Sequence, residues 1–399
     1  MKKILFVAEA VSLAHVARPS VLAGALSTAR YEIVFASNGA YGLCTAGSTW
    51  AKYRIEGISS ELFMKRLAQG SPVYSEEELQ QYVESDLRML EEIKPDLVVG
   101  DFRLSLAISA RLLKIPLIVI GNAYWSAFAN EQRMLAPDLP AARLLGFTVF
   151  DPIFRAAWPF ASRLHTAPIN RVRKRFGLKP YRSIREYYGD GDVVLYCDTP
   201  GLVPCTAAPA SHHFIGPVVW SPSVELPIWW AEAMAVDRPR VYITLGSTGD
   251  VDLLPKLVEA CVRQGLVCLV ATAGRTKWVS SSQLVFSADF LPGNLAAAAS
   301  SLVVCNGGSP TAHQALKEGV PVLGICSNLD QVLNMVGVCR VGAGLSMRAG
   351  EFSVERVSRD IALLQTQGSF ALAAQQVQGQ FRALNALDEF PRLVGQMLC

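Results

Sequence analysis

Short apolar runs alternate with stretches of helical periodicity along residues 1–120 of the chain. Strands are predicted where β-branched and other apolar residues follow one another, and helices where apolar positions recur every three or four residues. The longest of these helices covers 76–93 and has one apolar face. Such an alternation is typical of a doubly wound parallel sheet. The predicted strands are 3–8, 32–36, 53–55, 96–99 and 116–120, and the other predicted helices begin near Pro19 and cover 105–113.

A second alternation of the same kind begins at residue 240. Because each series could build its own parallel sheet, we predict an α/β fold with two Rossmann-like domains. The chain of 399 residues is long enough for each domain to bury its own core. In this second part the predicted strands are 240–244, 267–272, 302–305 and 320–326, and the predicted helices are 253–263, 310–318, 354–364 and 371–384.

Composition narrows the classes of function. Charged residues make up 18% of the chain and the net charge is only +3, so we do not expect a nucleic-acid partner. No apolar run approaches the roughly 20 residues of a membrane-spanning helix, and Glu9 interrupts the apolar start too early for a signal peptide. Nine scattered cysteines without a Cys-x-x-Cys pair suggest reduced thiols and no structural metal. We therefore expect a cytoplasmic protein.

The segment 302–331 carries the most specific pattern in the chain. An apolar, β-branched run at its start predicts a buried strand, and Gly307 and Gly308 predict a turn directly after it. Ser309 suits the N-cap of a helix, and Gly319 suits the residue just past its end. The segment is therefore predicted to form a strand, a glycine turn, a helix and a second strand.

This arrangement is suited to binding a diphosphate. Free N–H groups in the first turn of a helix, approached through glycines, bind phosphate. Asn306, Ser309 and Thr311 add neutral donors, and Gln314 lies one turn further along the same face, within reach of a ribose hydroxyl.

Asp330 and Gln331 follow the second strand of this segment. A carboxylate beside an amide is suited to holding the vicinal hydroxyls of a sugar. Taken singly, Asp330 could be only a helix N-cap and the glycines only a turn. The fixed order and spacing of all the parts favour a nucleotide-sugar site instead.

The order of these residues resembles the nucleotide-sugar signature of the family 1 glycosyltransferases, which include UDP-glycosyltransferases and bacterial macrolide glycosyltransferases. The family's His-Gly-Gly-x-Gly-Thr is matched by Asn306, Gly307, Gly308, Ser309, Pro310 and Thr311. Its ribose-binding acid is matched by Gln314, and its sugar-binding Asp-Gln pair by Asp330 and Gln331. Asn306, Pro310 and Gln314 depart from the family pattern, and each departure bears on the choice of donor.

His15 and Asp101 are the candidate catalytic pair. They follow the first and fourth predicted strands, which are neighbours in the usual strand order 3-2-1-4-5, so their loops should emerge side by side. A histidine held by a buried carboxylate is a general base with a fixed tautomer, although a surface histidine and a helix-capping carboxylate are the alternative. The resemblance favours the pair, since Ala14, His15, Val16, Arg18 and Pro19 give a shifted version of the family's Gly-His-Val-x-Pro.

The segment 124–181 is rich in aromatic and basic residues. In similar proteins it lines the acceptor pocket, and its rings suit an apolar acceptor bearing a hydroxyl. The alternative is an apolar helix pair that only covers the sheet, with its basic residues solvated. The basic cluster could also hold the protein to an anionic membrane, and it comprises Arg171, Arg173, Lys174 and Arg175.

The resemblance implies the GT-B fold, in which two Rossmann-like domains face each other across a cleft. It implies an acceptor domain at 1–213, a linker at 214–228, a donor domain at 229–384, and a last helix at 385–399 that packs on the first domain. Further donor contacts would come from Gly246, Ser247, Phe290, Leu291 and Pro292.

The implied reaction is the inverting transfer of a hexosyl group to a hydroxyl of an apolar small molecule or lipid. The donor would be a UDP-sugar or a dTDP-sugar, the base His15 oriented by Asp101, and no metal or other cofactor would be required. Two alternatives stay open: a UDP-sugar epimerase, and a weakly active partner protein that activates another transferase. The sequence leaves the oligomeric state open.

Overall fold

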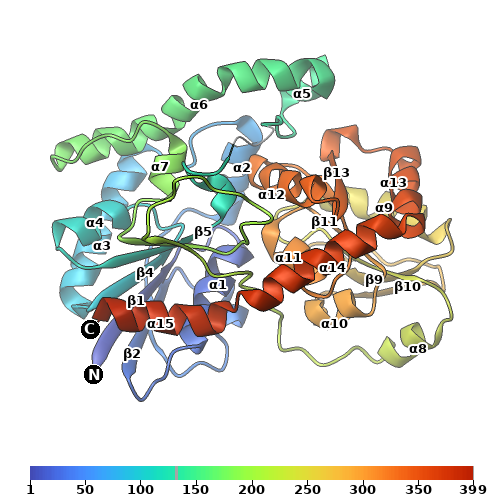
Figure 1. Cartoon of the computed structure of the whole chain (residues 1–399), viewed down its shortest axis with the longest axis horizontal. Coiled ribbons are helices and arrows are strands. Elements are labelled where there is room, and N and C mark those ends of the chain that lie inside the picture. Colours follow the sequence, from blue (N-terminus) through green and yellow to red (C-terminus); the bar gives the residue numbers. More distant parts are fainter. Residues whose placement is uncertain (131–133, 399) are drawn as a thin grey trace. The chain divides into compact units, whose positions relative to one another are not determined.

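The computed structural model describes residues 1–130 and 134–398, so Cys399 lies outside the described part. The chain forms two compact units. The first unit comprises Met1–Glu131, Arg155–Trp220 and Leu384–Cys399, and the second comprises Gln132–Phe154 and Ser221–Ala383. Each unit is built around its own parallel sheet (Figure 1).

The sheet of the first unit has seven strands in the order β3-β2-β1-β4-β5-β6-β7, and every neighbouring pair is parallel. The predicted order 3-2-1-4-5 is therefore confirmed. β1 and β4 are central and run side by side, with Ala8 paired to Asp101 at their carboxyl ends. The strands are β1 Lys2–Ala8, β2 Tyr31–Ser37, β3 Ala51–Arg54, β4 Leu97–Asp101, β5 Leu117–Gly121, β6 Val193–Tyr196 and β7 His212–Phe214.

Helices connect these strands on both faces of the sheet. The predicted helix at 76–93 is present with the same bounds, because Ser75 and Glu78 form a reciprocal capping box at its start. One long helix, α6, begins in the second unit and continues into the first. The helices are α1 Leu13–Gly24, α2 Ser60–Gln69, α3 Glu76–Ile93, α4 Leu106–Leu112, α6 Phe147–Arg175, α7 Ile184–Tyr188 and α15 Ala386–Leu398.

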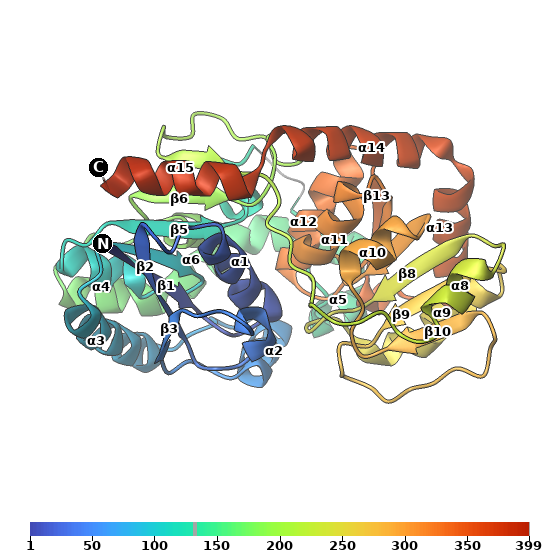
Figure 2. The ribbon, with the colours of Figure 1, turned by 90° about the horizontal axis from the view of Figure 1, so that it is seen from below.

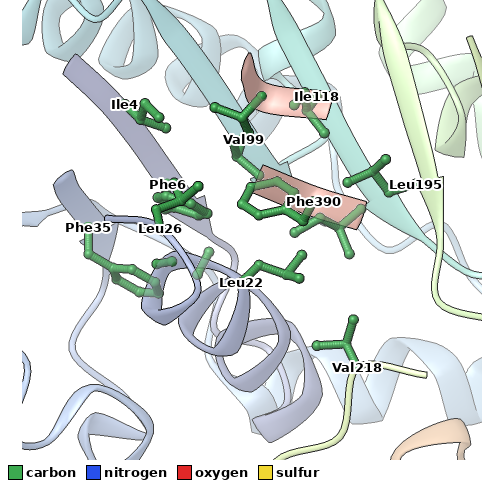
Figure 3. Close-up of a cluster of buried hydrophobic side chains, with 14 of the residues drawn as sticks. Ile4, Phe6, Leu22, Leu26, Phe35, Val99, Ile118, Leu195, Val218 and Phe390 are labelled. Carbon is green, nitrogen blue, oxygen red and sulfur yellow. The ribbon is translucent and has the colours of Figure 1, made fainter. Parts of the chain in front are cut away.

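The C-terminal helix α15 completes the core of the first unit. Phe390 is fully buried, and its ring lies 6.0 Å from that of Phe6 on β1, which in turn lies 6.3 Å from Phe35 on β2. Figure 3 shows Phe390 among aliphatic side chains from several sheet strands and from α1. The last residues of the chain therefore bury the face of the sheet built from the first ones.

The second unit has six parallel strands in the order β10-β9-β8-β11-β12-β13 (Figure 2). Its strands are β8 Arg240–Thr244, β9 Val267–Ala271, β10 Val285–Ala288, β11 Leu302–Cys305, β12 Val322–Cys326 and β13 Gly344–Arg348. Its helices are α5 Pro140–Leu145, α8 Trp230–Ala235, α9 Leu254–Val262, α10 Gly293–Ala298, α11 Ser309–Lys317, α12 Leu329–Arg340, α13 Val354–Thr366 and α14 Gly368–Ala383. Two doubly wound parallel sheets are thus present, as predicted.

The eight cysteines within the described residues are all free thiols. Over those same residues, none of the helices has the length and apolar character needed to cross a bilayer.

Candidate active site

His15 and Asp101 meet at the carboxyl edge of the first sheet. His15 Nδ1 lies 2.8 Å from Asp101 Oδ1, and the Asp101 side chain is fully buried whereas that of His15 is 18% exposed. The expectation that His15 lies in a loop is wrong, because α1 begins at Leu13 and already contains it. The turn of helix before Pro19 is held by burial of Val16 and Ala17 against the sheet.

Asp101 fixes the tautomer of His15, and Arg18 holds Asp101 in place. The Nε and Nη2 atoms of Arg18 donate to the two oxygens of Asp101 at 2.9 and 2.8 Å. Arg18 Nη2 also lies 3.0 Å from His15 Nδ1, but both nitrogens bond the same oxygen, so this separation follows from the shared acceptor. With a proton on Nδ1, His15 Nε2 is left as the acceptor.

Sequence reasoning assigned no role to Arg18, although a residue three positions after His15 lies on the same helical face. The Arg18 guanidinium is buried, and its Nη1 donates to Asn122 Oδ1 at 2.6 Å. Burial acts to lower the pKa of Arg18, but the charge and hydrogen bonds of Asp101 together with smaller contributions from Cys197 and Tyr124 outweigh it, so the pKa is raised. Arg18 thus stays charged and ties Asp101 to the strand ends.

A chain of aromatic ring contacts begins at His15. The ring of Phe102 stacks on His15 with centroids 4.5 Å apart and planes at 16°. Phe102 adopts a left-handed φ of 59°, a conformation that is strained for a bulky residue and common at functional sites. Tyr188 contacts Phe102 at 5.5 Å and Trp125 at 5.1 Å. The imidazole therefore borders the ring of Phe102, and of these three aromatic residues only Trp125 lies in the predicted segment 124–181.

A cluster of buried charges supports the same strand ends. Arg103 donates to Glu9 Oε2 at 2.8 Å and contacts Asp86 Oδ1 at 2.9 Å, and all three side chains are at most 1% exposed. Burial raises the pKa of both Glu9 and Asp86, although Arg103 opposes the rise. Because Glu9 follows β1 and Arg103 follows β4, this cluster holds together the segments that carry His15 and Asp101.

In the second unit, the segment 302–331 forms the predicted strand, turn, helix and strand. Gly307 has a φ of 80°, and a Cβ there would lie 2.7 Å from the Cys326 sulfur, so this position requires glycine. The prediction that Ser309 is the N-cap is wrong, because α11 begins at Ser309 itself. The side chain of Asn306 instead accepts from Gly308 N at 3.1 Å, and Gly319 follows the helix with the predicted positive φ.

The start of α11 is able to bind an anion. The N–H groups of Ser309 and Thr311 lie in the first turn, where an α-helix offers them no acceptor of its own. Pro310 contributes no donor, so its substitution for the family residue removes one N–H from this turn.

Thr248 joins three turns at the carboxyl edge of the second sheet. Its hydroxyl oxygen accepts from Asn306 Nδ2 at 3.0 Å and from Gln331 Nε2 at 3.2 Å. These residues follow β8, β11 and β12, which are neighbours in the sheet. With its lone pairs engaged by two amides, the hydroxyl can act toward a ligand only as a donor. Thr248 was missed because its role depends on residues about 60 and 80 positions away.

The predicted pair Asp330 and Gln331 opens α12, but the two side chains differ in role. Gln331 Oε1 accepts from the backbone N–H groups of Ser327 and Asn328 at 2.7 and 3.2 Å, as half of a capping box. Because Asn328 is the N-cap, the alternative that Asp330 serves only as the cap is wrong. Asp330 is half-exposed in the first helical turn.

The remaining predicted donor residues lie on neighbouring turns of the second unit. Gly246 has a φ of 57°, and Arg275 Nη1 donates to the carbonyls of Gly246 and Gly249 at 3.3 and 2.5 Å, which holds the turn that contains Ser247. Gln314 on α11 donates to Ser221 Oγ at 3.3 Å. The segment before α10 comprises Phe290, which is 38% exposed, and buried Leu291 and Pro292.

The aromatic and basic segment is divided in its roles. Tyr124 is fully buried, whereas Phe160 is 74% exposed. Of the basic cluster, Arg171 and Arg175 both pair with Glu76, and Arg173 is buried against Asp190 and Tyr181. These three arginines are therefore engaged within the protein.

Within residues 1–130 and 134–398, no group of three or more His, Cys, Asp or Glu side chains is arranged to hold a metal ion.

Mycobacterial glycosyltransferases are similar to this chain over most of its length. The PGL/p-HBAD biosynthesis rhamnosyltransferase of Mycobacterium bovis is 43% identical over 381 residues, which cover 95% of this chain and 84% of that one. A PGL/p-HBAD biosynthesis glycosyltransferase of Mycobacterium tuberculosis is 41% identical over 95% of this chain and 89% of its own length. A relative from Mycobacterium bovis named as inactive is 41% identical over 66% of this chain and 71% of its own length. No protein-family model matches the chain.

Solved structures match the fold. The spinosyn rhamnosyltransferase SpnG has a TM-score of 0.69 at 19% identity, covering 99% of this chain and 100% of its own. The glycosyltransferase VinC, solved in complex with dTDP, has a TM-score of 0.68 at 20% identity over 99% and 98% of the two chains. The predicted GT-B fold is thereby confirmed, and the protein is a glycosyltransferase. In particular, it belongs to the family of the mycobacterial PGL/p-HBAD biosynthesis glycosyltransferases.

Proposed function

We propose that this glycosyltransferase moves a hexosyl group from a nucleoside diphosphate sugar to a hydroxyl of an apolar acceptor, with inversion at the anomeric carbon. The observation that carries the proposal is the 2.8 Å contact between His15 Nδ1 and Asp101 Oδ1 at adjacent strand ends. This candidate pair belongs to the first unit, and the candidate donor residues at the start of α11 belong to the second.

The proposed base is His15 Nε2. It takes the proton from the acceptor hydroxyl while that oxygen attacks the anomeric carbon and the bond to the diphosphate oxygen breaks. In the resulting imidazolium, the proton on Nδ1 stays hydrogen-bonded to Asp101, and the negative charge of Asp101 stabilises the ring. Arg18 is a positioning residue in this scheme, since it holds Asp101 in place by two hydrogen bonds.

The proposed donor site is the carboxyl edge of the second sheet. The first-turn N–H groups of α11 and the Thr248 hydroxyl donate to the diphosphate as its negative charge grows. These neutral donors would make a metal ion unnecessary. In the same site, the Asp330 carboxylate would accept hydrogen bonds from the hydroxyls of the sugar.

The nucleotide is proposed to be UDP or dTDP, and the sugar a hexose or deoxyhexose such as rhamnose. Support comes from relatives named as rhamnosyltransferases and from a neighbour solved with dTDP.

The proposed acceptor is apolar and carries a hydroxyl, as in a lipid, polyketide or phenolic compound. The ring of Phe102, which stacks on His15, and the rings of Tyr188 and Trp125, which continue from it, suit an apolar body. The names of the relatives, which refer to PGL/p-HBAD biosynthesis, support the same class.

Single-turnover kinetics with purified protein would test the base. His15→Ala should lower turnover by about two to four orders of magnitude with donor affinity nearly unchanged. His213→Ala is the matched control, because His213 is a half-buried histidine of the same unit on β7, away from Asp101. Turnover of the His15 variant close to wild type would remove the assignment.

The relative named as inactive favours one alternative, a partner protein that activates another transferase. A panel of nucleoside diphosphate sugars and apolar acceptors distinguishes the two functions, since a partner protein would release no nucleoside diphosphate from any combination. An epimerase would instead convert the nucleotide sugar without any acceptor.

A further inference from the structure

Helix α6 leaves an apolar stripe uncovered. Val149, Ile153, Phe160 and Leu164 are 56%, 48%, 74% and 51% exposed. Successive members are four, seven and four residues apart, the spacing that aligns side chains on one face of an α-helix. Ala156, also exposed, fills the central gap on the same face. Single exposed apolar residues are normal on a protein surface, but a continuous stripe marks a contact site.

The stripe extends about 22 Å along the helix axis, at 1.5 Å per residue from position 149 to 164. Figure 1 shows α6 as one unbroken helix, so the side chains of the stripe are aligned by the geometry of this single helix. On the opposite side of α6, Ile169 and Val172 are buried in the core of the first unit. The helix therefore has one face committed to the protein and one apolar face left open.

The charges on α6 are mostly positive. The helix carries six basic residues and a single acid, Asp151, which is paired with Arg348 at 3.2 Å. Arg155 and Arg163 are exposed, and neither makes an ion pair within the described residues. On a helical wheel Arg163 lies directly beside the stripe, and Arg155 lies further round on the same side.

We infer that this face of α6 docks on an anionic lipid surface. An apolar stripe that enters the interface, flanked by arginines that reach anionic headgroups, is the pattern of an interfacial helix. The charge decides between occupants, because a second copy of α6 would bring its own arginines against these. The inference is independent of the proposed acceptor, since it concerns where the protein resides and not what it glycosylates.

Vesicle sedimentation with the full chain tests this inference without donor or acceptor. We expect binding to phosphatidylcholine vesicles that contain roughly 30% phosphatidylglycerol at low salt, weaker binding at high salt, and little binding to phosphatidylcholine alone. The double variant Phe160→Glu with Leu164→Glu should weaken binding at least about tenfold. Arg155→Gln with Arg163→Gln should remove most of the preference for the anionic lipid.

Val279→Glu with Leu372→Glu is the matched control, because these residues are 76% and 62% exposed outside α6 and add the same charge. It should change binding less than about twofold. Circular dichroism and donor-binding measurements check that each variant is folded. Absence of wild-type binding at low salt would overturn the inference. Equal loss of binding in the Phe160/Leu164 variant and in the Val279/Leu372 control would also overturn it. A third contrary result would be a wild-type dimer that dissociates in the Phe160/Leu164 variant while that variant still binds vesicles, since the stripe would then contact a second copy.

Discussion

Replacing Arg103 by methionine should strongly destabilise the first unit, and by an amount that depends on pH. Arg103 lies between two carboxylates that are as buried as itself. Its Nη1 also donates to the carbonyl of Glu56 at 2.6 Å, and its guanidinium stacks 3.8 Å above the ring of Tyr82. Methionine retains most of the volume of the side chain but none of these polar contacts.

Removing one partner of a buried ion pair typically costs about 3–5 kcal/mol, because the other charge is left without compensation. Arg103 serves both Glu9 and Asp86, so we expect the upper part of that range at neutral pH. Glu9→Gln leaves Arg103 paired with Asp86 and lowers the number of buried charges. It should therefore change the free energy of unfolding by less than about 1 kcal/mol, or raise it slightly.

The sign of the pH dependence follows from the two carboxyls. Burial raises their pKa in the folded state above the ordinary values of 4.5 for Glu9 and 3.8 for Asp86. A carboxyl with a raised pKa binds its proton more tightly when folded, so its contribution to stability is lost as pH rises through the interval between the two values. Without Arg103 the folded-state pKa of each carboxyl rises further. Within that wider pH range, the loss of folding stability caused by Arg103→Met grows by up to about 1.4 kcal/mol per pH unit for each carboxyl.

Urea unfolding at pH 5 and pH 8, followed by hydrogen exchange of peptides from β1 and β4, reports on the first unit alone. Leu106→Ala is the control for a buried defect without charge, since Leu106 is an apolar residue of the same unit that is 1% exposed. Its penalty should be the same at both pH values. A penalty for Arg103→Met below about 1 kcal/mol, or one that does not change with pH, would refute the reasoning.

Three further outcomes are expected. Asp330→Ala should weaken binding of the nucleotide sugar far more than that of the free nucleoside diphosphate in calorimetry, and equal losses would show that Asp330 does not read the sugar. Thr248→Val should lower affinity for the nucleoside diphosphate about tenfold, whereas Thr248→Ser should retain it, because valine removes the hydroxyl that joins Asn306 and Gln331; comparable losses in both would point to packing. Phe390→Ala should destabilise the first unit by about 3–5 kcal/mol in the same exchange experiment, because Phe390 is fully buried in its core; a loss under about 1 kcal/mol would mean that α15 is not part of that core.

The sequence predicted the elements whose signals are local. Uninterrupted apolar runs marked the buried parallel strands, and one apolar face marked the helix at 76–93, whose start the structure shows to be closed by a Ser75–Glu78 capping box. The strand, glycine turn and helix at 302–317 were equally well marked, because Gly307 and Gly319 are needed for their backbone angles. The pairing of His15 with Asp101 followed from strand order, which places the ends of β1 and β4 together.

Helix boundaries were less secure where packing overrode a local signal. Pro19 suggested that the first helix begins near it, yet α1 begins at Leu13. Burial of the preceding turn against the sheet offsets the backbone hydrogen bond that proline cannot make. Ser309 had the right chemistry for an N-cap, but the neighbouring Asn306 bonds Gly308 and moves the helix start by one residue.

Only the tertiary structure decided which polar groups form hydrogen bonds with one another. A sequence shows that Arg18, Arg103 and Thr248 are polar, but not that each lies between two partners. It shows that Phe160 is apolar, but not that the helix turns it outward while Phe390, more than 200 positions later, fills the core. Backbone propensity acts within a few residues, and so it can be read along the chain. Satisfaction of buried polar groups depends on contacts between segments far apart in sequence, and it is fixed only when the chain has folded.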